Sequence, residues 1–395
     1  MFTHHHAAYP YRPTPTPAVL LRLNYRVRVA YPGSPSAPAP TYFASLAPPT
    51  GGMELVCADA MHPDSLPAAM HGATYVIQLA SPFYIETPKD VEAGLMRPAV
   101  EGTTNVLRAF AAAAAGAAPG APRRRAILLS SIGAVAFGHK DSAERRYTEA
   151  DWTNGDCTDA SVTPNIRSVT AGERAAWTAW RAGPAPPPYD LVSVCASPMF
   201  GPLLGNYQCA PADIIKVFME RLFARLPAVN LSFSDMRDVV RVTVAALTSP
   251  TAPGHRLLLA ATAIRMPALG ALLAAEFDPL GWSVPTGTLP TWMLRTFALV
   301  SGAAANAVAN VDKPPLLATH AELAEHLGIT PADLHTSDAD VAANFIEMAY
   351  SLVRVGFTPD ASAAHHRSAA AARLPRWTPD TLAAQLADKY RHRAV

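Results

Sequence analysis

The sequence predicts an α/β protein built on a doubly wound parallel sheet, and three observations carry this prediction. Short continuous apolar runs recur along the chain, as in strands that helices bury on both faces. Segments with apolar residues at helical spacing alternate with these runs, which favours a parallel sheet. Half of the 395 residues are hydrophobic and only 16% are charged, so the composition is that of a globular protein with a large core.

Residues 1–17 are predicted as a disordered tail. They contain four prolines, which cannot donate hydrogen bonds within a central strand. They also contain His4, His5 and His6, but no second cluster of ligands in the sequence completes a metal site, so we expect none. The first acidic residue is Glu54, and the basic segment before it also fits a transit peptide, which is an alternative interpretation.

The chain after this tail alternates between helix and strand. Residues 18–31 have the pattern of a helix that runs into a strand, and residues 53–59 alternate as a second strand. Residues 73–82 form a buried strand that ends in small residues, and residues 97–115 have helical spacing. Two segments rich in proline and small residues are predicted as loops: 33–52 and 116–125.

The clearest strand is Ala126–Leu129, a continuous apolar run that leads into Ser130 and Ser131. In an open α/β sheet, ligands bind at the carboxyl ends of the strands, so these serines are the first candidates for chemistry. The same stretch also fits two serines that only end a strand and begin a turn.

The second half of the chain continues the alternation. A helix is predicted at 170–180 and a buried strand at 189–197, with another strand at 254–261. Further helices are predicted at 266–277, 344–357 and, as an amphipathic helix near the carboxyl terminus, 379–390.

Charge and cysteine usage exclude several function classes. The net charge of +1 provides no electrostatic basis for binding nucleic acid or an acidic membrane surface. No run of about eighteen apolar residues is free of charge and proline, so we expect no membrane span. The four cysteines form no Cys-x-x-Cys pair, which indicates reduced thiols and a cytoplasmic protein.

Five short segments, in this order and spacing, resemble the extended short-chain dehydrogenase/reductase superfamily, which is of the NAD-dependent epimerase/dehydratase type. The resemblance is to its dihydroflavonol reductase and cinnamoyl-CoA reductase-like branch and runs from about Leu20 to about Pro359. The segments are the ASP turn at 80–82, PAVEGTTNVL at 98–107, SSIGAVAFG at 130–138, GERAAW at 172–177 and SDMRDVV at 234–240.

The resemblance implies a domain organisation. Residues 18–197 would form a Rossmann-like dinucleotide-binding domain. Residues 198–360 would form a smaller C-terminal α/β substrate lobe, interleaved with the first domain. Residues 361–395 would be a C-terminal extension without a counterpart in the family.

The family begins with a strand, a glycine-rich turn and a helix that together hold the cofactor pyrophosphate. Here the first glycine is Gly33, and residues 18–31 resemble the end of the first helix and the second strand. We therefore expect the first strand and the glycine turn to be missing. The sheet would then have an unpaired central edge, compensated by pairing with the tail or accompanied by reduced stability.

The resemblance implies NADP or NAD as cofactor. Asp59 matches an aspartate that contacts the adenine, although as a bare sequence feature it is equally an ordinary helix cap. The other cofactor-binding positions implied by the resemblance are Ala60, Ala80, Ser81, Ser130 and Ser197.

The family's catalytic residues are a strand serine and a Tyr-x-x-x-Lys pair on one helical face. Ser131 keeps the serine position. The tyrosine and lysine positions are occupied by Asn165 and Val169, and no Tyr-x-x-x-Lys pattern occurs anywhere in the chain. An amide has no proton to exchange near neutral pH and valine has no charge, so the active site is predicted to be degenerate. Tyr147 is an alternative tyrosine, but the family places its segment outside the catalytic geometry.

Three functions follow from these residues. The first is an NAD(P)-dependent oxidoreductase acting on the CH–OH or C=O group of a small-molecule substrate, a carbonyl compound or secondary alcohol. The alternatives are an inactive pseudoenzyme or interaction protein that keeps the fold, and a nucleotide-sugar epimerase or dehydratase. A homodimer through the helices at 97–115 and 165–180 is a further expectation. A misassigned start would account for the missing glycine turn but not for Asn165 and Val169.

Overall fold

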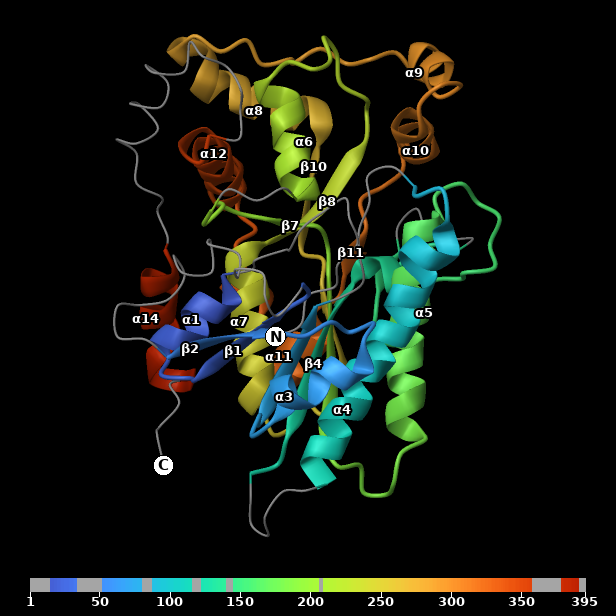
Figure 1. Ribbon diagram of the computed structural model, residues 1–395. Coiled ribbons are helices and arrows are strands. Elements are labelled where there is room, and N and C mark those ends of the chain that lie inside the picture. Colours follow the sequence, from blue (N-terminus) through green and yellow to red (C-terminus); the bar gives the residue numbers. More distant parts are fainter. Residues whose placement is uncertain are drawn as a thin grey trace.

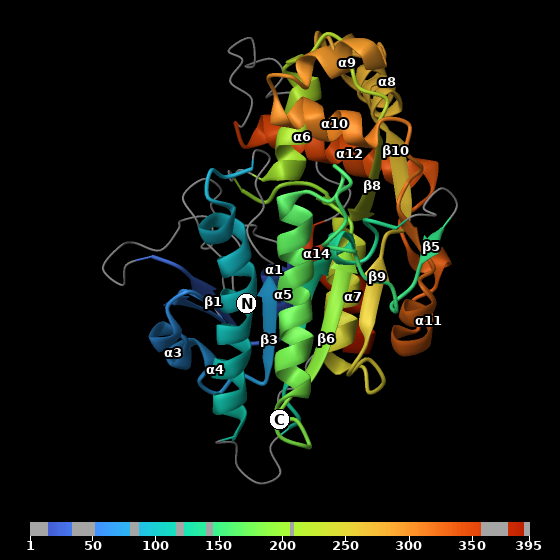
Figure 2. The ribbon, with the colours of Figure 1, turned by 90° about the vertical axis from the view of Figure 1, so that its right-hand side faces the viewer.

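The computed structural model describes residues 15–33, 52–79, 87–115, 122–139, 145–205, 209–356 and 378–390, and every structural statement below refers to these residues. A parallel sheet lies between two layers of helices, and a second lobe sits beyond the carboxyl ends of its strands (Figures 1 and 2). The predicted α/β class and parallel sheet are confirmed. The predicted loops at 33–52 and 116–125 fall largely outside the described residues.

The sheet has a four-stranded half and a two-stranded half. In the first half the strands are parallel and in the order β3 (Tyr75–Leu79), β4 (Arg125–Ser131), β6 (Asp190–Ala196) and β9 (Arg256–Leu259). In the second half β1 (Val27–Tyr31) pairs in parallel with β2 (Met53–Cys57). No described strand bridges β1 and β3. Since residues 1–14 are not described, the absence of a first strand remains a prediction.

Side chains that alternate along β4 separate the core into two layers. Ala126 and Leu128 pack in one cluster with Phe110 of α4 (Thr103–Ala115) and Trp177 of α5 (Pro164–Arg181). Ile127 and Leu129 belong to the opposite cluster, with apolar residues of α1 (Thr16–Arg22) and α7 (Met236–Thr248). Because both faces are buried, the strand is a continuous apolar run, as the sequence indicates.

The amino-terminal helix α1 is buried from Thr16 to Leu21. The prediction of a disordered tail at 1–17 is wrong for Thr16 and Pro17, which belong to this helix. Proline is compatible with the first turn of a helix, and Pro17 lies in that turn. Helix α14 (Pro379–Tyr390) lies against α1 and α7, on the left of Figure 1. Arg22 pairs with Asp380, and the Tyr25 hydroxyl donates to the Tyr390 carbonyl at 3.3 Å.

The described part of the carboxyl-terminal extension is thus a helix, α14, and it supplies no strand to the sheet. The predicted strand pairing from the tail is not found among the described residues. Helix α14 packs against α1, and no residue of the described range 378–390 pairs with β1 or β3.

The second lobe is built on a small three-stranded sheet in which β8 (Asn230–Asp235) lies between β7 (Met199–Phe200) and β10 (Thr262–Arg265). Phe200, Phe233 and Phe345 contact one another at its centre, with ring centroids 4.8 to 6.0 Å apart. The helices of this lobe are α6 (Ala210–Met219), α8 (Met266–Phe277), α9 (Thr291–Phe297), α10 (Gly302–Asn310) and α12 (Asp338–Arg354).

The remaining elements are short. They are α3 (Leu66–Met70), β5 (Arg146–Tyr147), β11 (Leu317–Ala318), α11 (Ala321–Leu327), the π-helical turns Glu92–Met96 and Pro98–Gly102 before α4, and the 3₁₀ turns Pro63–Ser65, Ile132–Ala134, Asp278–Leu280 and Pro331–Asp333. Of the described helices, none combines the length and the hydropathy needed to cross a bilayer. Helix α7 begins at a cap, because the Asp235 side chain accepts the Arg237 amide at 2.8 Å.

Candidate active site

A cavity of about 870 Å³ lies between the carboxyl ends of β4 and β6 and the second lobe. This is the edge at which open α/β sheets bind ligands. Apolar side chains of the second lobe line one wall, among them Leu203, Ile214 and Met266. Polar residues line both sides, with Ser131, Asn165 and Ser197 at the sheet and Asn230, Asn306 and Asn310 on the second lobe, so the cavity suits a ligand with polar groups on an apolar body.

Ser131 is the last residue of β4 and lines this cavity. Its Oγ accepts a hydrogen bond from the Gly133 amide at 3.0 Å, so the hydroxyl proton is left to donate elsewhere. A Cβ on Gly133 would lie 2.9 Å from Ile166 Cδ1 and 3.2 Å from both Ser131 Oγ and Val169 Cγ2. A side chain here would displace Ile166 and crowd Ser131, so glycine suits the place where β4 turns beneath α5.

Helix α5 brings Asn165 and Val169 to the same cavity. Thr163 caps the helix by accepting the Ile166 amide at 3.3 Å, and Pro164 occupies its first turn. Asn165 Oδ1 is buried and has no hydrogen-bond partner among the described residues. Ser131, Asn165 and Val169, which the resemblance predicts to occupy the family's serine, tyrosine and lysine positions, thus line one cavity.

Ser197, directly after β6, also lines the cavity. It is almost fully buried, and its Oγ has no partner in the described part of the chain. Ser130 lines the cavity as well, but its hydroxyl donates to Glu173 at 2.7 Å and is committed to the interior.

Behind the cavity lies a buried ion pair, Glu173 of α5 with Arg256 of β9. Arg256 Nε donates to Glu173 Oε1 at 2.8 Å, and the hydroxyls of Ser130 and Ser193 donate to the same carboxylate. The Arg256 guanidinium stacks over Trp152, 3.6 Å from its ring centroid. We call Glu173, Arg256, Ser130 and Ser193 the Glu173–Arg256 network.

Electrostatics keep this network ionised. Burial by itself raises the pKa of Glu173, but the Arg256 charge and the hydrogen bonds from Arg256, Ser193 and Ser130 outweigh it, and the pKa lies below its ordinary value. Burial likewise raises the pKa of the Cys195 thiol, helped by the nearby Glu173 charge. The thiol is thus kept protonated and unreactive.

A second, more exposed ion pair borders the cavity. Lys313 Nζ lies 3.4 Å from Asp159 Oδ1, and both residues line the cavity. Hydrogen bonds from the Ser161 side chain and amide lower the pKa of Asp159, and Lys313 adds to this effect. Asp159 is therefore a carboxylate at neutral pH and does not act as a proton donor there.

Asp59 and Ala60 do not line the described cavity. The Asp59 carboxylate accepts the Met61 amide at 2.8 Å and lies 3.2 Å from His62 Nδ1, as in an ordinary turn. Ala60 is buried, and its carbonyl accepts from the Asn105 side chain. Ala80 and Ser81 lie outside the described residues. Tyr147 is fully buried and does not line the cavity, although it packs behind Ile132 and Ala136, which do.

Sequence reasoning missed the Glu173–Arg256 network, although GERAAW served to align the helix. One signal was present. Glu173 lies on the helical face formed by Thr170, Ala176 and Trp177, where a carboxylate needs a buried partner. Arg256 is 83 residues away, and nothing in the sequence joins the two.

No family model matches the chain. Among curated proteins, tetraketide alpha-pyrone reductase 2 of Arabidopsis thaliana is 26% identical over 204 residues, 51% of this chain and 60% of that protein. A cinnamoyl-CoA reductase of Medicago truncatula is 26% identical over 208 residues, 52% of this chain and 60% of that protein. The chain thus matches 60% of the length of these two relatives.

Solved structures show the fold. Yeast methylglyoxal/isovaleraldehyde reductase, complexed with NADPH, matches with a TM-score of 0.65 and 18% identity over 86% of this chain and 96% of the other. Vestitone reductase from alfalfa matches with a TM-score of 0.61 and 18% identity over 87% and 94%. A nucleoside-diphosphate-sugar epimerase from Pseudomonas aeruginosa matches with a TM-score of 0.60 and 16% identity over 87% and 94%. The chain therefore has the Rossmann fold of these proteins.

Proposed function

We infer that this chain, a relative of the dihydroflavonol reductase-like branch of the extended short-chain dehydrogenases/reductases, is an NADP(H)-dependent oxidoreductase of a small carbonyl compound or secondary alcohol. The observation that carries the proposal is the cavity at the strand ends, lined by Ser131, Asn165 and Ser197. The preference for NADP(H) over NAD(H) rests on the NADPH complex of the yeast reductase.

The polar atoms on the sheet side fit the nicotinamide end of such a cofactor. Asn165 Oδ1 and Ser197 Oγ are buried, line the cavity and have no described partner. A buried polar atom without a partner is costly, and a bound carboxamide or ribose would supply the missing hydrogen bonds. The cofactor, when bound, supplies the hydride that reduces a carbonyl carbon.

Ser131 is the residue that would orient the substrate. With the Gly133 amide donating to its Oγ, the Ser131 proton is free to donate to a carbonyl oxygen in the cavity. The alkoxide formed by hydride transfer still needs a proton. Asn165 cannot release one near neutral pH, so we propose that water supplies it. Loss of a positioned acid costs on the order of 10² to 10⁴ in rate.

Direct titration tests this proposal. NADPH and NADH are titrated into the full chain by fluorescence, and NADPH consumption is followed with a panel of aldehydes and ketones. The same assays are run on Asn165→Tyr/Val169→Lys and on a control of similar bulk, Asn165→Phe/Val169→Met. We expect the native chain to bind NADPH and turn over slowly. The Tyr/Lys variant should gain on the order of 10² to 10⁴ in rate, and the control should gain nothing.

A second candidate is a protein that binds dinucleotide without turnover, favoured by the lack of any Tyr-x-x-x-Lys pattern in the chain. NADPH binding without turnover in the native chain, even with the full panel, would support this candidate. Failure of both nucleotides to bind at millimolar concentration would contradict both candidates.

A further inference from the structure

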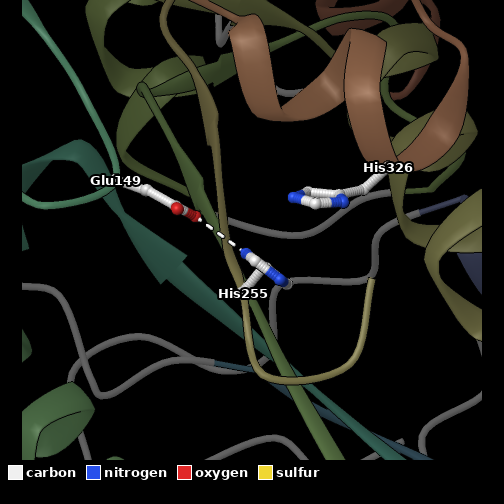
Figure 3. Close-up of side chains that lie close together, drawn as sticks. All are labelled: Glu149, His255 and His326. Atoms are coloured by element: carbon white, nitrogen blue, oxygen red, sulfur yellow. Dashed lines mark hydrogen bonds and ion pairs between the residues drawn. The ribbon is translucent and has the colours of Figure 1, made fainter. Parts of the chain in front are cut away.

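A cluster of two histidines and a glutamate, drawn in Figure 3, lies at the amino-terminal end of β9. Glu149 follows β5, His255 directly precedes β9, and His326 lies on α11. Glu149 Oε2 is 3.2 Å from His255 Nδ1, and the two imidazole rings are 3.9 Å apart between centroids, tilted by 35°. One potential ligand atom from each residue lies within 4.8 Å of the other two.

We propose that Glu149, His255 and His326 form a site for a divalent transition-metal ion, with Zn²⁺ as the preferred ion. The proposal is independent of the reductase function. Two imidazole nitrogens and one carboxylate oxygen are a donor set that zinc binds at about 2.0 to 2.2 Å. Mg²⁺ and Ca²⁺ are less suited because they favour oxygen ligands.

Two unsatisfied polar atoms distinguish this cluster from an ordinary histidine–glutamate contact. His326 Nδ1 is buried and has no hydrogen-bond partner among the described residues. Glu322 lies one helical turn before His326 and is 7% exposed, and its Oε2 has no described partner. Its Oε1 accepts the Glu149 amide at 3.3 Å, which places a second carboxylate beside the cluster.

A cation would offset this accumulation of negative charge. Glu149 and Glu322 each carry a carboxylate, and removing a carboxylate from water without a partner is unfavourable. A water would complete four-coordination around the ion. The two imidazole rings are stacked and the ligand atoms are farther apart than in a closed tetrahedral site, so at least one ring must rotate for both nitrogens to face the ion. The His255 and Glu149 side chains are 36% and 37% exposed, which leaves a path for the ion.

The ion would join three segments that the sequence keeps far apart. Glu149 and His255 are 106 residues apart, and His326 comes from α11. Arg256, the chain neighbour of His255, donates to the Glu149 carbonyl at 2.8 Å. Metal binding would therefore stiffen the segment that also holds the Glu173–Arg256 network, and we expect it to raise the melting temperature.

The test uses the full chain with His4, His5 and His6 changed to alanine, because three consecutive histidines can bind a stray metal ion and obscure the stoichiometry. After removal of metal with a chelator, Zn²⁺ is titrated by calorimetry, and Co²⁺ is titrated by visible absorption. We expect one ion per chain, intense Co²⁺ bands of a four-coordinate site, and a rise in melting temperature with Zn²⁺. His255→Ala, His326→Ala and Glu149→Gln should each weaken binding at least tenfold and abolish the thermal shift.

His62→Ala is the matched control, because His62 contacts Asp59 at the same 3.2 Å without a place in the cluster. It should leave binding unchanged. Circular dichroism verifies that each variant is folded, and Glu149→Gln preserves side-chain shape should the alanine variants unfold. The proposal is overturned if the native background binds no stoichiometric Zn²⁺, or if folded His255 and His326 variants bind as tightly as that background.

Discussion

The side chains of Ser130 and Ser131, consecutive residues at the end of β4, lie in two different environments. Ser130 donates to the Glu173 carboxylate inside the molecule, where every oxygen of that carboxylate has a partner. Ser131 faces the cavity, next to Asn165, whose Oδ1 has no described partner. On the interior side both carboxylate oxygens have hydrogen-bond partners, whereas on the cavity side a buried amide oxygen has no described partner.

This difference indicates what each side is for. A buried charge pair is strongly destabilising when one partner is removed, so the Glu173–Arg256 network is expected to govern stability. Unpartnered atoms on a cavity wall make no hydrogen bond that their removal would take from the fold, and they are available to a ligand. Changes on the interior side should therefore alter folding, and changes on the cavity side should alter binding.

The largest effect is expected from Arg256→Ala, which leaves the Glu173 carboxylate buried without its counter-charge. The free energy of unfolding should fall by about 3 to 5 kcal/mol, measured by urea denaturation. Arg97→Ala is the control: it breaks an ion pair with Glu101 in which both side chains are more than half exposed, and should cost about 0 to 1 kcal/mol. Equal costs for the two variants would contradict the assigned role of the network.

The pH dependence of stability should report the same carboxylate. The pKa of Glu173 is depressed below its ordinary 4.5 in the folded state, so its contribution is fully present above the unfolded value and lost as pH falls through the folded value. Glu173→Gln should be less stable than the native chain at neutral pH. The gap between their free energies of unfolding should close as the pH is lowered below about 4.5. A gap that stays constant down to the acid transition would argue against an ionised Glu173.

Gly172→Ala tests how closely α5 packs against the π-helical turn Pro98–Gly102 that leads into α4. A Cβ there would lie 2.8 Å from the Ala99 carbonyl oxygen, a backbone atom that cannot move aside. We expect a loss of about 1 to 3 kcal/mol in thermal unfolding. Gly155→Ala, where no atom lies within 4 Å of the added carbon, should change the melting temperature little. An unchanged melting temperature for Gly172→Ala would show that the two helices can separate.

The smallest effect on stability is expected from Asn165→Ala. Since Oδ1 has no described partner, the free energy of unfolding should change by about 0.5 kcal/mol or less. The affinity for NADPH should instead fall by about 0.5 to 1.5 kcal/mol, which fluorescence titration measures. A marked loss of stability with unchanged affinity would reverse the comparison between the two sides.

The sequence was sufficient for elements with strong local patterns. Helices α8 and α14 match the predicted residues 266–277 and 379–390, and β6 lies within the predicted strand 189–197. Strand β4 contains the predicted apolar run Ala126–Leu129 and extends beyond it at both ends, to Arg125 and to Ser131. In each, apolar spacing is continuous and the boundaries carry small, polar or proline residues. The meeting of Ser131, Asn165 and Val169 was predicted from the family resemblance and not from spacing.

The remaining features depend on long-range contacts that no local pattern encodes. Glu173 meets Arg256 across 83 residues, and Glu149 meets His255 across 106. A lone glutamate in a helix and a lone histidine before a strand are ordinary surface residues until the fold places a partner beside them. The expectation that the first strand is missing rests on the resemblance alone, and it stays a prediction because residues 1–14 are not described.

The packing of α14 on α1 has a consequence for biosynthesis. Asp380, which pairs with Arg22, is made 358 residues later. At about 5 to 20 residues per second, α1 would wait roughly 20 to 70 s for that contact while the chain is being translated. The part of its apolar surface that α14 covers is therefore accessible to chaperones throughout this interval, whereas the part that packs on α7 can be buried once Thr248 has been made. Docking of α14 is expected to be a late step in folding.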